Sequence, residues 1–295
     1  MTVSRVGTQQ SQSFVMQQIN YSLSRYVSTQ EQVTTGQKSQ RFSGIADDAS
    51  NSINLANSKV MIEQYNRSSD TTNSRLSAAS NVLENLVDIA SKFRAQLLQG
   101  LTADQAALAR LDRVADGNLE QIESGLNTDL AGVYIFAGTK SDQQPVDLSD
   151  SSNNILGLYY SGGKDLLETR IDETTTLQYG ATADRQGFKD LIEAMQRVSN
   201  GVNDQTQLET ALDKVNSALN DLTQLQAELG HQMSVVEGAK TRNEALRATV
   251  VEQLGSIRDV DISAAMVELT QRQTILQASY LVISRSSQLT LTNYL

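Results

Sequence analysis

The sequence predicts a mainly α-helical fold, an elongated antiparallel helical hairpin or coiled-coil rod with paired terminal helices and a small β-rich insertion at its tip. Apolar residues recur every seven residues in several long segments, as in helices that pack in coiled coils. The 295 residues include one proline, Pro145, so long helices can run without interruption on both sides of it. Helical segments precede and follow a central β-rich stretch in nearly mirrored order, which would bring the two ends of the chain side by side.

The N-terminal residues 1–35 form the first predicted helix. Its apolar residues fall on one narrow face. They are Val15, Ile19, Leu23, Tyr26 and Val33. A polar stretch with glycines at positions 36 and 44 then separates this helix from the next one.

The C-terminal helix, predicted over about 262–291, has a similar stripe. Its members are Ile262, Met266, Leu269, Leu276, Tyr280 and Ile283. A stripe this narrow needs a partner helix, which is either the other end of the chain or the same segment in a second copy. We therefore predict that the two terminal stripes form an assembly interface.

Two long helical segments lie between the ends. One is predicted from about 49 to 98, continuing after Gly100 in a further helix to about 128, with heptads that include Leu76, Leu83 and Leu97. The other runs from about 188 to 254, with a break expected at 255–256. Its main heptad row is Leu208, Val215, Leu222, Leu229 and Val236, and its second row is Leu212, Leu219 and Met233, interrupted by Gln226. We expect these segments to pack antiparallel.

Residues 131–187 have a β-rich pattern instead. Predicted strands are 133–137, 155–160, 167–171 and 174–179. The heptad and β-rich patterns together predict three domains: a terminal helical assembly domain (1–45 plus 256–295), a helical rod domain (46–130 plus 188–255) and a small β-rich variable domain (131–187).

The composition excludes several classes of function. A net charge of −10, from 24 basic and 34 acidic residues, argues against general nucleic-acid binding. The chain has no cysteine, so disulfides and thiolate chemistry are excluded. No apolar run is long enough for membrane insertion, and residues 1–20 lack the pattern of a cleaved signal peptide. A cytoplasmic protein and one exported unfolded both fit these properties.

Catalytic and metal-binding patterns are not found. His231 is the one histidine, and we interpret it as a surface residue. Asp47 and Asp48 fit the N-terminus of a helix better than a metal site, because carboxylates are favoured at that end of the helix dipole. Gly162 and Gly163 lack the spacing of a phosphate-binding loop. The sequence therefore predicts a protein that is not an enzyme and has no cofactor or metal.

Three stretches resemble the bacterial flagellin family, and in particular its hook-associated protein 3 branch, the hook–filament junction proteins. The first is residues 32–38, similar to a "Q-x-x-T-G" turn, followed by Asp47-Asp48-Ala49. The second is residues 132–138, similar to the branch's "G-x-Y-I-F-A-G" strand. The third comprises residues 259–273 and the Tyr294-Leu295 ending. The branch commonly has proline where this chain has Ala49, which is a flagellin-like departure.

The resemblance implies a structural subunit of the flagellum. Such proteins are exported unfolded through the type III channel with the help of a chaperone, and their terminal helices form the inner wall of a helical tube. Expected partners are further copies of the chain, hook-associated protein 1, flagellin and the export chaperone, and the expected location is extracellular. A filament flagellin of the same fold remains the alternative, and a cytoplasmic coiled-coil adaptor is a more distant one.

Overall fold

The computed structural model describes residues 2–101 and 105–292, with side chains over 13–101 and 108–285. The chain divides into two compact units. The first comprises Met1–Val60 with Ala248–Leu295, and the second comprises Met61–Arg247. Each unit is described by itself below.

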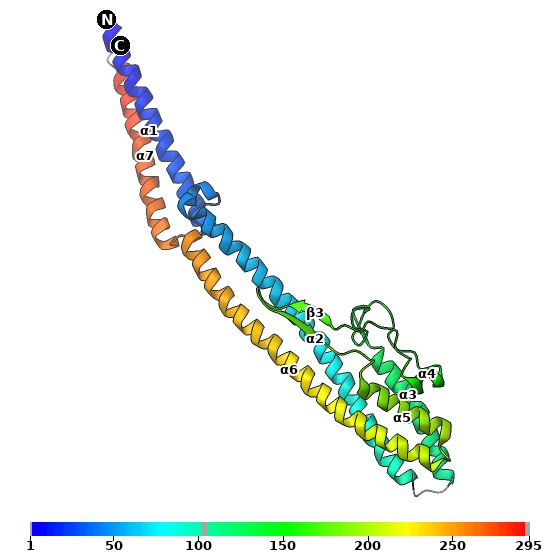
Figure 1. Ribbon diagram of the computed structural model, residues 1–295. Helices are drawn as coiled ribbons and strands as arrows, with labels where there is room; N and C mark the ends of the chain where they lie inside the picture. The colour runs from blue at the N-terminus through cyan, green and yellow to red at the C-terminus, as the bar shows by residue number, and fades with distance from the viewer. Residues whose placement is uncertain (1, 102–104, 293–295) are drawn as a thin grey trace. The chain divides into compact units, whose positions relative to one another are not determined.

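The first unit contains the two terminal helices. Helix α1 (Thr2–Thr35) and helix α7 (Ile262–Thr292) lie side by side, blue and red in Figure 1. The first part of α2 (Ala49–Gly100), the last part of α6 (Gln205–Arg258) and a short 3-10 helix, η1 (Phe42–Asp48), complete the unit. The predicted bounds of both terminal helices are confirmed to within two residues. The predicted break at 255–256 is wrong: α6 continues through both positions to Arg258.

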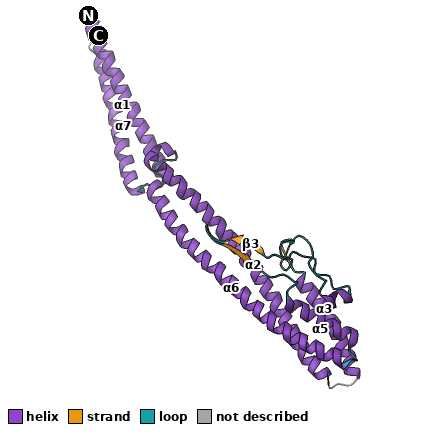
Figure 2. Ribbon diagram, in the orientation of Figure 1, coloured by secondary structure: helices purple, strands orange, loops and turns teal. Residues whose placement is uncertain are grey.

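The second unit is built on the remaining lengths of α2 and α6, with α3 (Gln105–Leu126), α4 (Ser151–Leu156) and α5 (Gln186–Gly201) (Figure 2). The helix predicted over 188–254 is two helices, because the chain turns between Gly201 and Gln205. Asp204 starts α6 there: its carboxylate accepts a hydrogen bond from the Thr206 amide (2.9 Å). This is how an acidic residue caps a helix N-terminus.

The heptad residues of α2 and α6 form the core of the second unit. The α2 heptads are at most 1% exposed, as are Val215, Leu222 and Leu229 on α6. The second row predicted on α6 is displaced by one position. Ala211, Ala218 and Leu225 are the buried residues, whereas Leu212, Leu219 and Met233 lie at the edge of the core. Gln226 is exposed, so it does not interrupt the core.

Two short antiparallel sheets confirm a small β-rich part within a mainly α-helical chain. Strand β1 (Asp129–Leu130), which the sequence did not predict, pairs with β2 (Val133–Tyr134). Strand β3 (Leu167–Arg170) and strand β4 (Thr176–Tyr179), which were both predicted, pair with each other. The strand predicted over 155–160 is wrong. Its first residues end helix α4, which Asp150 caps at its start and Gly157 closes at its end.

The β3–β4 hairpin contacts the sides of α2 and α6 rather than extending beyond their ends. Arg75 of α2 donates a hydrogen bond to the hydroxyl of Tyr179 (2.7 Å). Asn243 of α6, which is buried, donates to the carbonyl of Ile171 (2.8 Å). A buried amide at a heptad position thus finds its acceptor on the hairpin, which satisfies part of its hydrogen-bonding capacity.

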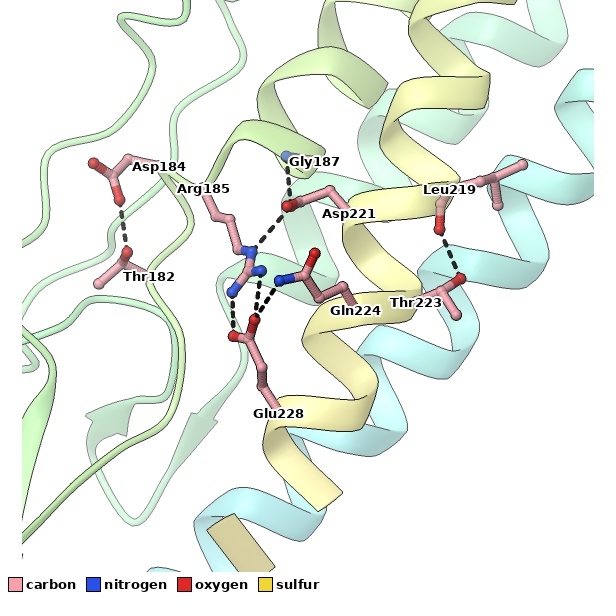
Figure 3. Close-up of polar contacts among 9 residues, drawn as sticks. All are labelled: Thr182, Asp184, Arg185, Gly187, Leu219, Asp221, Thr223, Gln224 and Glu228. Carbon is pink, nitrogen blue, oxygen red and sulfur yellow. Dashed lines mark hydrogen bonds and ion pairs between the residues drawn. The ribbon is translucent and has the colours of Figure 1, made fainter. Parts of the chain in front are cut away.

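Arg185 joins the start of α5 to α6. Its guanidinium donates to Asp221 (3.0 Å) and, through two nitrogens, to Glu228 (2.6 and 3.0 Å) (Figure 3). The amide of Gly187 also donates to Asp221 (2.9 Å). The hydrogen bond from Arg185, with its charge, lowers the pKa of Glu228. This bidentate arrangement fixes the direction in which the chain returns from the β-rich part to the helices.

Candidate assembly interface on the terminal helices

One face of α1 packs on α7, and we call the contact between them the terminal seam. On α1 its residues alternate at spacings of four and three, as in a coiled coil. They are Val15, Ile19, Ser22, Tyr26, Thr29 and Val33, which are half-buried or buried. Ile19 is 5% exposed and Thr29 is 3% exposed, and the Thr29 hydroxyl donates to the carbonyl of Arg25 (3.0 Å).

The matching face of α7 follows the same spacing. Its residues are Ala265, Leu269, Arg272, Leu276, Ser279 and Ile283. Ala265 is 3% exposed and the other five are half-buried. The partner of each terminal helix on this face is therefore the other end of the same chain, not a second copy.

The predicted interface residues divide into two groups. Seven of them lie in the terminal seam: Val15, Ile19, Tyr26, Val33, Leu269, Leu276 and Ile283. The side chains of the remaining four are exposed, with exposed fractions of 39% for Leu23, 50% for Ile262, 54% for Met266 and 51% for Tyr280. A single narrow stripe therefore does not describe either helix.

The first unit also exposes large apolar residues that the sequence analysis missed. On α1 they are Phe14, Met16, Tyr21 and Val27, and on α7 they are Val267, Ile275, Leu281 and Val282. Val267 is 71% exposed and Phe14 is 66% exposed. The signal was present in the sequence: apolar residues directly follow or precede the heptad positions, so the apolar surface is broader than the seam. Exposed apolar residues gathered on one element mark an interaction surface.

The two flanks of the helix pair differ in chemistry. One flank holds a groove of about 340 Å³. Its lining is Gln18, Tyr21, Ser22, Arg25, Glu268, Gln271, Arg272 and Ile275. The Arg25 guanidinium lies 5.6 Å from the centre of the Tyr21 ring, and Arg272 forms an ion pair with Glu268. Cations and aromatic rings attract each other at this distance.

The other flank is uncharged at the positions next to the seam. The groove holds residues that directly precede Ile19, Tyr26, Leu269 and Leu276 on their helices. The seam positions in between are Val15, Ser22 and Thr29 on α1 and Ala265, Arg272 and Ser279 on α7. Residues that directly follow these positions therefore point to the opposite side of the helix pair. These are Met16, Leu23 and Gln30 on α1 and Met266, Gln273 and Tyr280 on α7. An uncharged flank of this kind can be buried against another protein without the cost of desolvating charges.

The structure offers little else that could support chemistry. Within the described residues, three or more histidine, aspartate or glutamate side chains do not come together in a group that could hold a metal ion. His231 is exposed on α6. None of the helices in the described part of the chain has the length and apolar character needed to cross a membrane.

Comparisons with known proteins point to flagellar proteins. Residues 212–295, which include α7 and all but the first seven residues of α6, match the bacterial flagellin C-terminal helical region. A search of curated protein sequences gave no match.

Solved structures with the same fold include FlgL from Bacillus cereus, at 20% identity and a TM-score of 0.59, covering 68% of this chain and 99% of that one. A putative flagellar hook-associated protein from Vibrio parahaemolyticus has 16% identity and a TM-score of 0.62, covering 73% and 100%. Flagellar hook associated protein-3 from Legionella pneumophila has 16% identity and a TM-score of 0.57, covering 74% and 100%. The chain thus carries a flagellin C-terminal helical region and resembles the bacterial flagellin family, with the fold of hook-associated proteins.

Proposed function

We propose that this chain is a structural, non-enzymatic subunit of the bacterial flagellum, placed at the junction between hook and filament. In this role it is exported, resides outside the cell and assembles with further copies of itself and with neighbouring axial proteins. The exposed apolar surface of α1 and α7 is the observation that carries the proposal. The flagellin match over α7 and the hook-associated fold support it.

The proposed mechanism is burial of that surface between subunits. A fully buried large apolar side chain contributes roughly 1.5–3 kcal/mol relative to an exposed one. Several such residues on each helix provide enough free energy to offset the loss of freedom when a subunit joins. A contact between the unlike flanks of neighbouring copies is head-to-tail, and such contacts give rings or helical tubes.

Deletion of the gene tests the junction role. The expected phenotype is cells that keep their hooks, lack filaments and release flagellin monomers into the medium. Complementation with the intact gene should restore filaments. Cells that lose filaments without releasing flagellin would contradict a junction role.

Point variants test the interface. Met266→Asp or Val267→Asp should reduce incorporation of the protein into flagella, because a carboxylate would be buried between subunits without a partner. Leu158→Asp is the matched control, since Leu158 is 65% exposed but lies in the second unit. Both groups of variants should be exported in equal amounts, measured as protein in the medium plus protein on the flagella of a strain that lacks the natural gene. Normal incorporation of both terminal variants would remove these residues from the interface.

A filament flagellin of the same fold is the second candidate. The alanine at position 49, where junction proteins commonly have proline, favours it, as does the match to the flagellin C-terminal region. Labelling the protein on intact cells separates the two candidates. Label confined to a short zone at the hook supports the junction, and label along the filament supports a flagellin.

A further inference from the structure

Two short linkers pair with each other inside the first unit. Residues 36–38 follow α1, and residues 258–260 comprise the last residue of α6 and the first two residues of its connection to α7. Gln37 and Asp259 form an antiparallel bridge. The amide of Lys38 donates to the carbonyl of Arg258 (2.7 Å), and the amide of Val260 donates to the carbonyl of Gly36 (2.9 Å). The two main-chain segments are thus held together directly at the end of α1 and the start of α7.

Side chains reinforce this pairing from both linkers. The ammonium group of Lys38 donates to the carbonyl of Ser256 (2.7 Å), and the side-chain amide of Gln32 at the end of α1 donates to the carbonyl of Lys38 (2.8 Å). Arg258 donates to the hydroxyl of Ser52 on α2 (2.6 Å) and lies over the ring of Phe42. The pairing is therefore anchored to α2 as well as to the ends of the terminal helices.

Gly36 allows α1 to end at the correct place for this pairing. Its φ is +71°, a left-handed conformation that closes a helix and that residues with a side chain rarely adopt. Its amide donates to the carbonyl of Gln32 (2.8 Å), and its own carbonyl is then free to turn toward Val260.

The terminal seam by itself does not select one alignment of α1 and α7. Counting outward from the Gln37–Asp259 pair, Tyr26 comes opposite Thr270, so its nearest seam residue on α7 is Leu269. A slip of one heptad would make Leu276 its nearest seam residue, which is again apolar against apolar.

The layers of the seam that lie between these large apolar residues do not distinguish the observed alignment from the slipped one either. Arg272 lies in these layers, but its guanidinium pairs with Glu268 on the same helix and would move with it in a slip. The other side chains are mostly small or polar, namely Ser22, Thr29, Ala265 and Ser279. Such residues can face one another in either alignment without a clash or a large loss of buried apolar area. A heptad repeat specifies the face of a helix, but its register has to come from another feature.

We propose that the pairing of 36–38 with 258–260, which we call the register clip, fixes the alignment of α1 with α7. A slip of seven residues moves one helix by about 10 Å at 1.5 Å per residue, a shift that both clip hydrogen bonds forbid. The clip gives every copy of the chain the same outer surface on its terminal helices. It does so whether or not the chain assembles into a flagellum.

Disulfide trapping tests the register clip, because the natural chain has no cysteine. One double variant, Tyr26→Cys with Leu269→Cys, reports the observed alignment. A second, Tyr26→Cys with Leu276→Cys, reports the slipped one. Disulfides require Cα atoms within about 7 Å, so a one-heptad difference is well resolved.

Each of these double-cysteine reporters is made in a chain with an intact register clip and in two further chains in which one substitution breaks the clip. Val260→Pro removes the amide that donates to Gly36, and Lys38→Pro removes the amide that donates to Arg258. Lys38→Met is the matched control, because it removes the contact with Ser256 and keeps the main-chain pairing. Circular dichroism of each variant verifies that the second unit is folded.

With the intact clip and in Lys38→Met, the aligned reporter should oxidise within the monomer and the slipped reporter should remain at least tenfold less oxidised. In both proline variants the slipped reporter should rise several-fold. If the slipped reporter stays reduced in both proline variants while the aligned reporter still oxidises, the seam sets the register and the proposal is wrong. Failure of the aligned reporter with an intact clip would also overturn it.

Discussion

Phe136 and Phe188 meet edge to face, with ring centroids 5.8 Å apart and ring planes at 78°. Phe136 follows β2 and Phe188 lies in the first turn of α5, and both side chains are fully buried. The amide of Ala183 donates to the carbonyl of Phe136 (2.9 Å). The pair therefore joins the entry and the exit of the β-rich part in the core of the second unit.

Phe136→Ala should destabilise the second unit by about 3–5 kcal/mol, because it removes a buried ring and leaves a cavity that the surrounding helices cannot close fully. Phe136→Leu should cost less, since it keeps much of the volume. Urea unfolding followed by circular dichroism measures both. Equal losses for the two variants would show that the ring-to-ring contact, rather than volume, dominates.

The loop between β1 and β2 offers a stabilising change. Its two residues, Ala131 and Gly132, have φ values of 57° and 78°. Positive φ at both positions is typical of a type I′ turn, for which Asn-Gly is preferred. Ala131→Asn should raise stability by roughly 0.5–1 kcal/mol, because asparagine tolerates this conformation better than alanine.

Gly132→Ala is the opposite change at the neighbouring position. Its added methyl group would meet no atom within 4 Å, so any loss of stability comes from the backbone. We expect a loss of roughly 1–2 kcal/mol. Stability that is unchanged in both variants would mean that the loop does not hold these φ values in solution.

The Arg185–Glu228 contact predicts how stability depends on pH. The hydrogen bond from Arg185 lowers the pKa of Glu228 below its ordinary value of 4.5 in the folded chain. The unfolded chain then binds the proton more readily, so the stabilisation is present above about pH 4.5 and is lost as the pH falls through the lowered pKa. The Glu228 side chain is 41% exposed, which limits the contribution to about 1 kcal/mol or less.

Glu228→Gln tests this pH dependence. The variant should melt at a lower temperature than the natural chain at pH 7, and the difference should shrink below pH 4.5. Glu237→Gln, an exposed change on the same helix, is the control and should leave the melting temperature unchanged at both pH values. A difference that stays constant between pH 7 and pH 3.5 would exclude the proposed role of the Glu228 charge.

The long helices could be predicted from the sequence because their heptads extend over many turns. Leu76 to Leu97 on α2 and Leu208 to Val236 on α6 are buried as the spacing indicated. It was harder to predict which heptad positions of α6 are buried, because leucine at 212 and 219 is more apolar than alanine at 211 and 218. The small residues are buried because they let the helices approach closely.

The short elements were predicted less well, for local reasons. The apolar residues 155–160 have the composition of a strand, but the Asp150 carboxylate accepts amide hydrogen bonds from residues 152 and 153 and starts a helix. On the terminal helices, the stripe found from the sequence mixes seam residues with exposed ones. Which apolar residue faces the partner helix depends on register, and the hydrogen bonds of the register clip are made by main-chain atoms that carry no sequence signal.

Leu276 and Leu281 allow the contact within the chain to be separated from the contacts between chains. Leu276 is half-buried in the terminal seam, whereas Leu281, five residues further along the same helix, is 53% exposed. Leu276→Asp should loosen α1 from α7 in the free chain, because a carboxylate in the seam has no partner there. Hydrogen exchange of the α1 amides should then accelerate by tenfold or more, which corresponds to at least about 1.4 kcal/mol of lost local stability.

Leu281→Asp should leave that exchange unchanged and reduce incorporation into flagella. The two variants carry the same substitution on the same helix, so a general effect of aspartate on helix stability would affect both equally. If Leu281→Asp accelerates exchange as much as Leu276→Asp does, Leu281 is also part of the intramolecular contact. The surface available for assembly would then be restricted to the flank formed by Met16, Leu23, Met266 and Tyr280.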